Sequence, residues 1–310
     1  MSFLYVLEGI RNPVLNVLMQ AFTELGGELV FLVVAIIMLW CMDKKCGYYM
    51  LTVGFVGIIC NQFLKLWFRI PRPWVKDPNF TIVESARAAA TGYSFPSGHT
   101  QNAFTVMGAP ARYYKNRTLR IVLSVLICLT AFSRMYLGVH TPYDVGVSFV
   151  LGLLLVFLLY PLFAKMEENP RRIYALYAFC ICISAAYLCF VYFYPFPADI
   201  DPANYAEGVK NGWMILFCSF GLLLVFYMDR NKLHWTTAAP LWAQVVKVAA
   251  GLIITLILKS GLKAPLNALF HGSPIAGGIR YGIVILFAGI VWPMTFRWFS
   301  QRKPLRSKED

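Results

Sequence analysis

The chain has 310 residues, of which 59% are hydrophobic and 14% are charged. A soluble domain carries about 25% charged residues, so this apolar surplus exceeds what one core buries and predicts an integral membrane protein. The net charge of +13 does not indicate nucleic-acid binding, because the basic residues lie between hydrophobic segments rather than in one patch. The eight cysteines include no pair of C-x-x-C motifs, so neither a disulfide framework nor a structural metal is predicted.

The chain begins with a mixed segment, residues 2–24, which is interrupted by Asn12 and Pro13. We expect this segment to form an interfacial helix rather than to span the bilayer. The apolar runs that follow predict an all-α, polytopic bundle of about nine transmembrane helices. The predicted spans are 28–42, 48–68, 98–112, 119–138, 142–163, 172–194, 212–228, 240–258 and 279–297.

The loop charges predict how the chain is oriented in the membrane. Lysine and arginine gather on one side of the nine-span arrangement, and such loops face the cytoplasm. We therefore expect a cytoplasmic C-terminus, an outer N-terminus, and an extracytoplasmic polar stretch at 69–96. The basic loops lie near residues 44–45, 112–120, 165–172, 230–232 and 297–308.

Three cations fall near the outer ends of the first spans: Lys65, Arg72 and Arg134. An unpaired charge is unfavourable at a low-dielectric boundary, so something anionic must accompany them. The nearest acidic candidates, Glu84 and Asp144, are too few to neutralise all three. Arginine geometry suits phosphate, so we expect a phosphate-binding site.

A second cluster, Pro96-Ser97-Gly98-His99, opens the span at 98–112. Ser97 is a favourable N-cap, and Gly98 lets backbone come close to a ligand. Free N–H groups and the helix dipole would attract an anion there, with His99 in the first turn.

The third cluster supplies a nucleophile and an acid that orients it. Thr141, Pro142 and Asp144 are typical of the first positions of a helix, and His140 immediately precedes the cap. Asp144 can therefore reach back to one ring nitrogen of His140 and aim the other outward. A histidine held in this way beside cations is a plausible phosphoryl acceptor.

These motifs resemble the three-part signature of the type-2 phosphatidic acid phosphatase superfamily. The parts are Lys65-x6-Arg72-Pro73, Pro96-Ser97-Gly98-His99 and Ser133-Arg134-x5-His140-x3-Asp144, and their order and internal spacing agree with that signature. The resemblance covers roughly residues 1–165. It predicts a phosphatase core there and leaves 166–310 as a four-span extension of unknown role.

The resemblance implies a role for each matching residue. His140 attacks phosphorus, Asp144 orients it, and His99 protonates the leaving oxygen and then activates water. The implied mechanism needs no metal and no other cofactor, because fixed cations stabilise the developing charge. The implied phosphate-binding residues are Lys65, Arg72, Ser97, Gly98 and Arg134.

The expected substrates are lipid phosphate monoesters or isoprenoid and lipid diphosphates, which would reach the site from the surrounding membrane lipids. Undecaprenyl diphosphate, phosphatidate, phosphatidylglycerophosphate and a sphingoid phosphate stay open, as does the oligomeric state. One alternative is a phosphatase for a soluble sugar phosphate, because the span count also resembles glucose-6-phosphatase. Another is a phosphate- or lipid-binding transporter without hydrolysis.

Overall fold

The structure is a computed structural model that describes residues 1–300, and within these residues the secondary structure is helical, with no β-strand. The all-α fold class predicted from the sequence is confirmed. Residues 301–310, which include much of the predicted basic C-terminal tail, lie outside the described residues.

The N-terminal half contains nine α-helices. They are α1 (Ser2–Gly9), α2 (Pro13–Glu24), α3 (Glu28–Ile37), α4 (Lys44–Phe68), α5 (Pro73–Lys76), α6 (Gly98–Ala103), α7 (Ala109–Tyr113), α8 (Arg117–Tyr136) and α9 (Pro142–Ala164). A π-helical turn, η1 (Met38–Met42), ends α3, and another, η3 (Phe104–Gly108), joins α6 to α7. A short 3-10 turn, η2 (Glu84–Ala86), lies in the polar stretch before α6.

The C-terminal half contains six more α-helices. They are α10 (Pro170–Phe193), α11 (Pro202–Met228), α12 (Leu241–Gly261), α13 (Lys263–Leu269), α14 (Ile275–Leu286) and α15 (Phe296–Ser300). Short turns extend α11 and α14, namely η4 (Asp229–Leu233), η5 (Phe287–Val291) and η6 (Pro293–Thr295).

Seven helical segments of the described chain are long and apolar enough to cross a membrane. An eighth is added if α2 and α3–η1, which are bent by 47°, form one broken span. The predicted spans at 28–42 and 98–112 are helical but shorter than the roughly 20 residues that cross the hydrocarbon core unaided. The predicted polytopic helical bundle is confirmed, and the seven or eight candidate spans of the described residues are close to the expected number of about nine.

The boundaries of two segments differ from those expected. Helix α11 begins ten residues before the predicted 212, because Asp201 caps it by accepting a hydrogen bond from Asn204 N at 2.7 Å and Pro202 occupies the first turn. The N-terminal segment splits at Asn12, whose side chain caps α2. Helix α2 then packs along α8.

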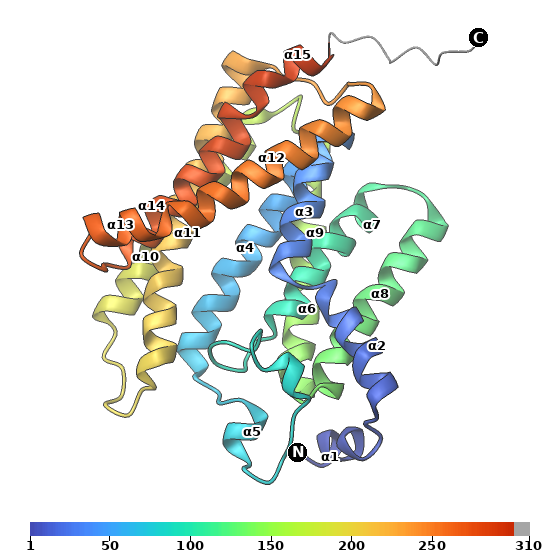
Figure 1. Cartoon of the computed structure of the whole chain (residues 1–310), viewed down its shortest axis with the longest axis vertical. Coiled ribbons are helices and arrows are strands. Elements are labelled where there is room, and N and C mark those ends of the chain that lie inside the picture. Colours follow the sequence, from blue (N-terminus) through green and yellow to red (C-terminus); the bar gives the residue numbers. More distant parts are fainter. Residues whose placement is uncertain (301–310) are drawn as a thin grey trace.

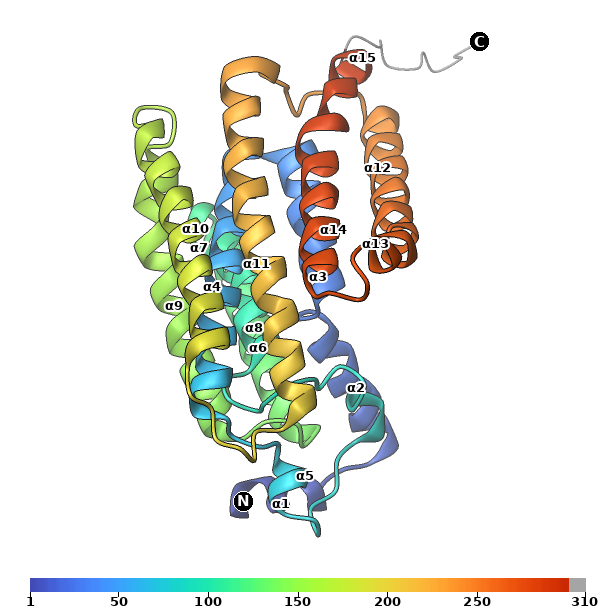
Figure 2. The same ribbon diagram turned by 90° about the vertical axis from the view of Figure 1, so that its left-hand side faces the viewer.

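Helix α4 lies at the centre of the bundle and packs against α6, α7, α9, α10 and α11 (Figures 1 and 2). The main core contains large side chains such as Tyr49 of α4, Phe104 of η3 and Phe226 of α11. Lys247 of α12 is also buried, and its Nζ donates to Trp40 O at 2.7 Å, so it ties α12 to η1. The connections α9–α10 and α11–α12 lie at the upper end in both views, whereas α5 lies at the lower end.

Candidate active site

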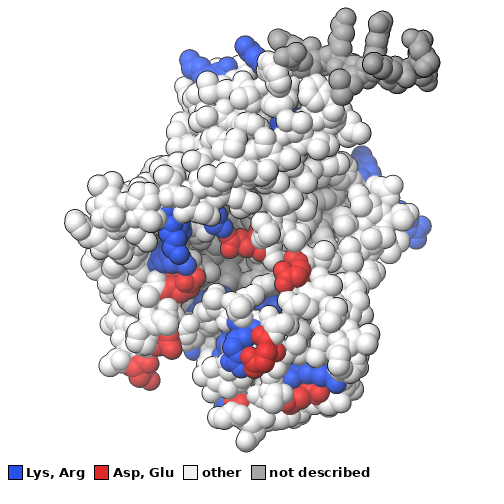
Figure 3. Space-filling view, viewed as in Figure 1, with Lys and Arg blue, Asp and Glu red and all other residues white. Residues whose placement is uncertain are grey.

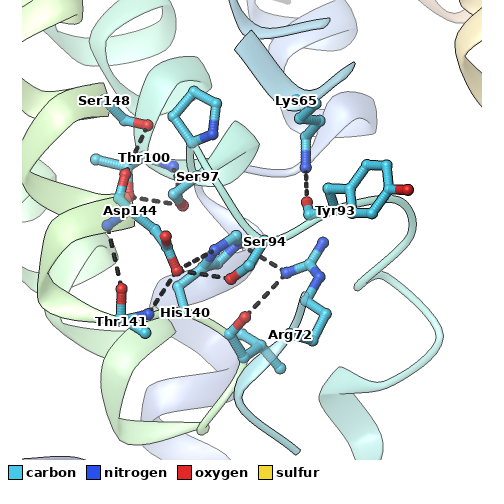
Figure 4. Close-up of polar contacts among 12 residues, drawn as sticks. Lys65, Arg72, Tyr93, Ser94, Ser97, Thr100, His140, Thr141, Asp144 and Ser148 are labelled. Atoms are coloured by element: carbon cyan, nitrogen blue, oxygen red, sulfur yellow. Dashed lines mark hydrogen bonds and ion pairs between the residues drawn. The ribbon is translucent and has the colours of Figure 1, made fainter. Parts of the chain in front are cut away.

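The structure brings the eight predicted site residues together where α4 and α8 end and α6 and α9 begin. Five of them, Lys65, Arg72, Ser97, His140 and Asp144, are labelled in Figure 4. The eight residues come from the last turn of α4, the N-cap of α5, the start of α6, the last turn of α8, and the turn into α9. In that order, these segments supply Lys65, Arg72, Ser97 with Gly98 and His99, Arg134, and His140 with Asp144.

The turn between α8 and α9 sets the position of His140. Gly138 has φ of +82°, a left-handed conformation that glycine adopts without strain, and it reverses the chain after α8. Thr141 then begins α9 with a capping box: its Oγ1 accepts from Asp144 N at 3.3 Å, and Asp144 Oδ2 accepts from Thr141 N at 2.7 Å. Asp144 is therefore fixed by the helix cap itself.

The His140 ring has two different neighbours. Its Nε2 lies 3.0 Å from Arg72 Nη1, and its Nδ1 lies 3.6 Å from Asp144 Oδ2. A guanidinium donates hydrogen bonds and accepts none, so we assign the lone pair to Nε2 and the proton to Nδ1. This tautomer directs an N–H towards the carboxylate and leaves the lone pair on Nε2.

His140 is held as a neutral imidazole. It is 1% exposed. Burial lowers its pKa well below the usual value, and the charges of Arg72, Arg134 and Lys65 lower it further. The ring therefore keeps its lone pair at neutral pH, as a nucleophile requires.

Arg72 is held by neutral oxygens. Its Nε donates to Gly92 O at 3.1 Å, Nη1 to Val139 O at 2.9 Å, and Nη2 to Thr91 O at 2.7 Å. These carbonyls orient the guanidinium without neutralising its charge. Lys65 is held in the same way, because its Nζ donates to the carbonyl oxygen of Tyr93.

Arg134 is 1% exposed, and its Nη1 donates to Thr23 Oγ1 at 2.6 Å. Its Nε and Nη2 are buried and have no hydrogen-bond partner. Among the described residues, none of the three site cations forms an ion pair with a carboxylate. Buried cations without an ion-pair partner are arranged in a way that would favour an anion between them.

The start of α6 contributes polar groups to the same place. Ser97 caps the helix, since its Oγ accepts from the backbone N–H of Thr100 at 3.4 Å. The N–H of Ser97 donates to Asp144 O at 3.1 Å. A Cβ added at Gly98 would meet no protein atom within 4 Å, so space for a ligand lies beside its backbone. His99 in this turn is within electrostatic range of Arg134, Arg72 and Lys65.

Two side chains at the site were not anticipated from the sequence. Ser94 Oγ donates to Asp144 Oδ2 at 2.6 Å, across 50 positions of the chain, and Thr23 is the partner of Arg134. Neither residue lies within the three motifs, so spacing gave no signal for them. Across residues 1–300, no three His, Cys, Asp or Glu side chains are grouped so as to hold a metal.

Comparison with known proteins identifies the family. Residues 45–168 match the PAP2 superfamily, and residues 214–304 match the PAP2 superfamily phosphatase transmembrane extension. The chain is 34% identical over 176 residues to phosphatidylglycerophosphatase B of Bacillus subtilis (strain 168), covering 53% of this chain and 82% of the relative. It is 31% identical over 152 residues to undecaprenyl-diphosphatase BcrC of the same organism, covering 48% and 76%.

Among solved structures, that of Aquifex aeolicus LpxE aligns with a TM-score of 0.44 and 25% identity, over 51% of this chain and 92% of that one. The relatives from Bacillus subtilis and the family match agree with the motifs and with the apolar helices of the described residues. The chain is an integral membrane phosphatase that belongs to the PAP2 superfamily.

Proposed function

We propose that this enzyme hydrolyses lipid phosphate monoesters or lipid and isoprenoid diphosphates through a phosphohistidine formed on Nε2 of His140. The observation that carries the proposal is the pairing of a neutral, oriented imidazole with three buried cations, none of which forms an ion pair with a carboxylate of the described residues. Such a site attracts the phosphoryl group and presents a nucleophile to it.

The first step transfers the phosphoryl group to the enzyme. Phosphoryl oxygens accept hydrogen bonds from Arg72, Arg134 and Lys65, and the Arg72 contact with His140 is exchanged for one with the substrate. Burial and the neighbouring cations lower the pKa of His99; the bound phosphoryl anion offsets these cations, so His99 takes up a proton as the substrate binds. Nε2 then attacks phosphorus, the bond from phosphorus to the leaving oxygen breaks, and protonated His99 donates its proton to that oxygen. The Asp144 carboxylate stabilises the positive charge that the His140 ring acquires.

The second step releases phosphate. His99 is now the base, and it takes a proton from a water molecule that attacks the phosphohistidine. The phosphorus–nitrogen bond breaks, His140 returns to its neutral form, and phosphate departs. The fixed cations stabilise the charge in both transition states, so this mechanism needs no metal ion.

Two features support a lipid substrate. The site lies at the end of a bundle whose helices are apolar enough to span a membrane, so a lipid phosphate can approach without leaving the bilayer. The two relatives from Bacillus subtilis are named for a phosphatidylglycerophosphatase and an undecaprenyl-diphosphatase. A lipid-linked phosphate or diphosphate is the substrate class that both share.

The proposed orientation places the site on the extracytoplasmic side. Basic residues of the α3–α4, α9–α10 and α11–α12 connections are expected to face the cytoplasm, and the site lies at the other end of α4. The C-terminus is then cytoplasmic. A single cysteine introduced near the C-terminus, with the native cysteines replaced, should resist an impermeant thiol reagent in intact cells; labelling there would contradict this orientation.

Activity of the purified protein tests the proposed reaction. Phosphate release would be measured in chelator from lipid phosphates, isoprenoid diphosphates and sugar phosphates, with His140→Ala as the control. Release from a lipid substrate that disappears in His140→Ala supports the proposal. Exclusive hydrolysis of a sugar phosphate would contradict the lipid substrate, and lipid movement that survives His140→Ala without hydrolysis would indicate a transporter.

The role of His99 has its own test. An alcohol is a poorer leaving group than a phosphate, so protonation matters more for a monoester than for a diphosphate. His99→Ala should therefore slow monoester hydrolysis more strongly than diphosphate hydrolysis. Equal losses on both substrates would contradict the assignment of His99 as the acid.

A further inference from the structure

Arg134 stands apart from the other two site cations in how it is held. Carbonyl groups of the 91–93 segment hold Arg72 and Lys65, but Arg134 is held by a side chain of another helix. Thr23 Oγ1 accepts the Nη1 hydrogen bond at 2.6 Å, while Nε and Nη2 stay unpaired and buried. The direction in which this guanidinium points therefore depends on Thr23.

Thr23 is itself held in a fixed place. It is 1% exposed, and with Met19 it forms the buried side of α2, one helical turn apart. Two hydrogen bonds join α2 to the residues of α8 that flank Arg134: Thr130 Oγ1 donates to Phe22 O at 3.1 Å, and Tyr136 OH donates to Asn16 Oδ1 at 3.0 Å. The acceptor is thus in place before any substrate arrives.

The residue type suits the task. A threonine hydroxyl orients a guanidinium through one hydrogen bond and leaves its positive charge intact. An aspartate or glutamate there would form an ion pair and reduce the attraction of Arg134 for phosphate. The two unpaired nitrogens are then free for phosphoryl oxygens.

The bend that follows Thr23 also contacts the site. A Cβ added at Gly26 would lie 2.3 Å from the carbonyl oxygen of His99, so the α2–α3 bend packs directly against the backbone of the acid. The family match begins at residue 45, so this N-terminal segment lies outside it. Two separate contacts therefore join the segment to residues of the site.

We propose that Thr23 is a positioning residue for catalysis: it holds Arg134 by Nη1 so that the Nε and Nη2 donors meet the phosphoryl group without reorganisation. The inference rests on the proposed function, in which Arg134 binds that group. It also gives the N-terminal segment a role in the active site rather than in membrane anchoring alone.

The test compares Thr23→Val, which keeps shape and removes the acceptor, with Thr23→Ser, which keeps it. Thr130→Val is the matched control, because it removes an equally buried hydroxyl that bonds α8 to α2 without contacting Arg134. We expect Thr23→Val to lower kcat/KM by about 10- to 100-fold, the usual effect of losing a hydrogen bond to a charged group. Inhibition by inorganic phosphate should weaken in parallel, while Thr23→Ser and Thr130→Val stay close to wild type.

Equal losses in Thr23→Val and Thr130→Val, or unchanged phosphate inhibition in Thr23→Val, would overturn the inference. If Thr23→Val does not fold, Thr23→Ala replaces it, because alanine also removes the hydroxyl that accepts from Arg134, and the same outcomes apply. Arg134→Lys distinguishes failure of the proposed function from failure of the proposed role of Thr23. Wild-type activity in Arg134→Lys would contradict the proposed function, whereas loss there together with a fully active Thr23→Val would overturn the role of Thr23 alone.

Discussion

Both ends of this bundle contain lysine and arginine side chains, but these cations have different partners at the two ends. At the end opposite to the site, a cavity of about 630 Å³ is lined by charged side chains of α4, η4 and the α9–α10 connection. There Lys44 Nζ lies 2.8 Å from Asp229 Oδ1, Tyr48 OH donates to Asp229 Oδ2 at 3.0 Å, and Arg230 pairs with Glu167. Figure 3 shows charged side chains of both signs around a different hollow, in the middle and lower part of the view, away from the upper end.

In the candidate active site the cations form no ion pair with a carboxylate, because Asp144 contacts His140, Ser94 and Thr141 instead. Arg72, Lys65 and Arg134 are oriented by carbonyl and hydroxyl oxygens, which leave a net positive charge at the centre of the site. A buried cation that is paired with a carboxylate stabilises the fold, whereas one held only by neutral oxygens can still bind an anionic ligand. The kind of partner therefore distinguishes the two roles. Substitutions at the two ends should accordingly have opposite consequences: loss of activity at one, loss of stability at the other.

The largest expected effect comes from substituting His140, the proposed nucleophile. His140→Ala should lower kcat by about 10⁵-fold or more, because the covalent route is lost. The measurement is phosphate release by the purified variant. His234→Ala is the matched control, since His234 is exposed and lines the opposite cavity. Substantial activity in His140→Ala would contradict the mechanism.

The next effect concerns the geometry of Arg72. Arg72→Lys keeps the charge but cannot reproduce bonds from three nitrogens, so kcat/KM should fall by about 10²- to 10³-fold. Arg230→Lys tests the comparison from the other end, because Arg230 is partly exposed and already paired with Glu167. Similar activities for Arg72→Lys and Arg230→Lys would break the distinction between the two ends.

A smaller effect is expected at Ser94. Ser94→Ala removes a donor to the Asp144 carboxylate and should reduce kcat/KM by about 10-fold. Ser148→Ala is the control, because Ser148 is equally buried but donates to the backbone carbonyl of Asp144, at 3.1 Å. Steady-state kinetics of the two variants decide whether the carboxylate contact matters.

At the opposite end the expected change is in stability. Lys44→Met leaves the buried Asp229 without its cation, and the free energy of unfolding should fall by about 2 kcal/mol, less than for a fully buried pair because Lys44 is partly exposed. Activity per folded molecule should not change. Adding Asp229→Asn should restore much of the stability, as thermal unfolding in detergent would show. A catalytic defect in Lys44→Met with normal stability would reverse the assignment.

The smallest expected effect is a pH dependence. The pKa of His140 is lowered in the folded protein by burial and neighbouring cations, whereas the unfolded residue titrates near pH 6.5. Below pH 6.5 the unfolded chain binds a proton at His140 that the folded protein does not bind. The free energy of unfolding therefore decreases as the pH is lowered. This loss of stability begins as the pH falls through about 6.5 and grows below it. His140→Gln should reduce the dependence of the unfolding free energy on pH; a dependence identical to that of the wild type would contradict the burial argument.

The sequence was most informative where the signal is local. Apolar runs predicted the helical segments, and the capping pattern of Thr141 and Asp144 predicted the start of α9. The three motifs predicted which residues would meet, because each motif lies at the end of a helix. Nothing local predicted that Ser94 bonds Asp144 or that Thr23 bonds Arg134, since 50 and 111 positions separate these partners. The start of α11 was missed because its first turns are polar and resemble a loop.

Direct detection of the covalent intermediate tests the central claim. The enzyme would be mixed with its best substrate, quenched within milliseconds under alkaline denaturing conditions that preserve phosphohistidine, digested, and analysed by mass spectrometry. The account predicts one phosphoryl group on the peptide that contains His140, absent in His140→Ala and longer-lived in His99→Ala. Phosphate on another residue, or rapid turnover with no phosphorylated peptide under conditions that preserve a phosphohistidine standard, would contradict it.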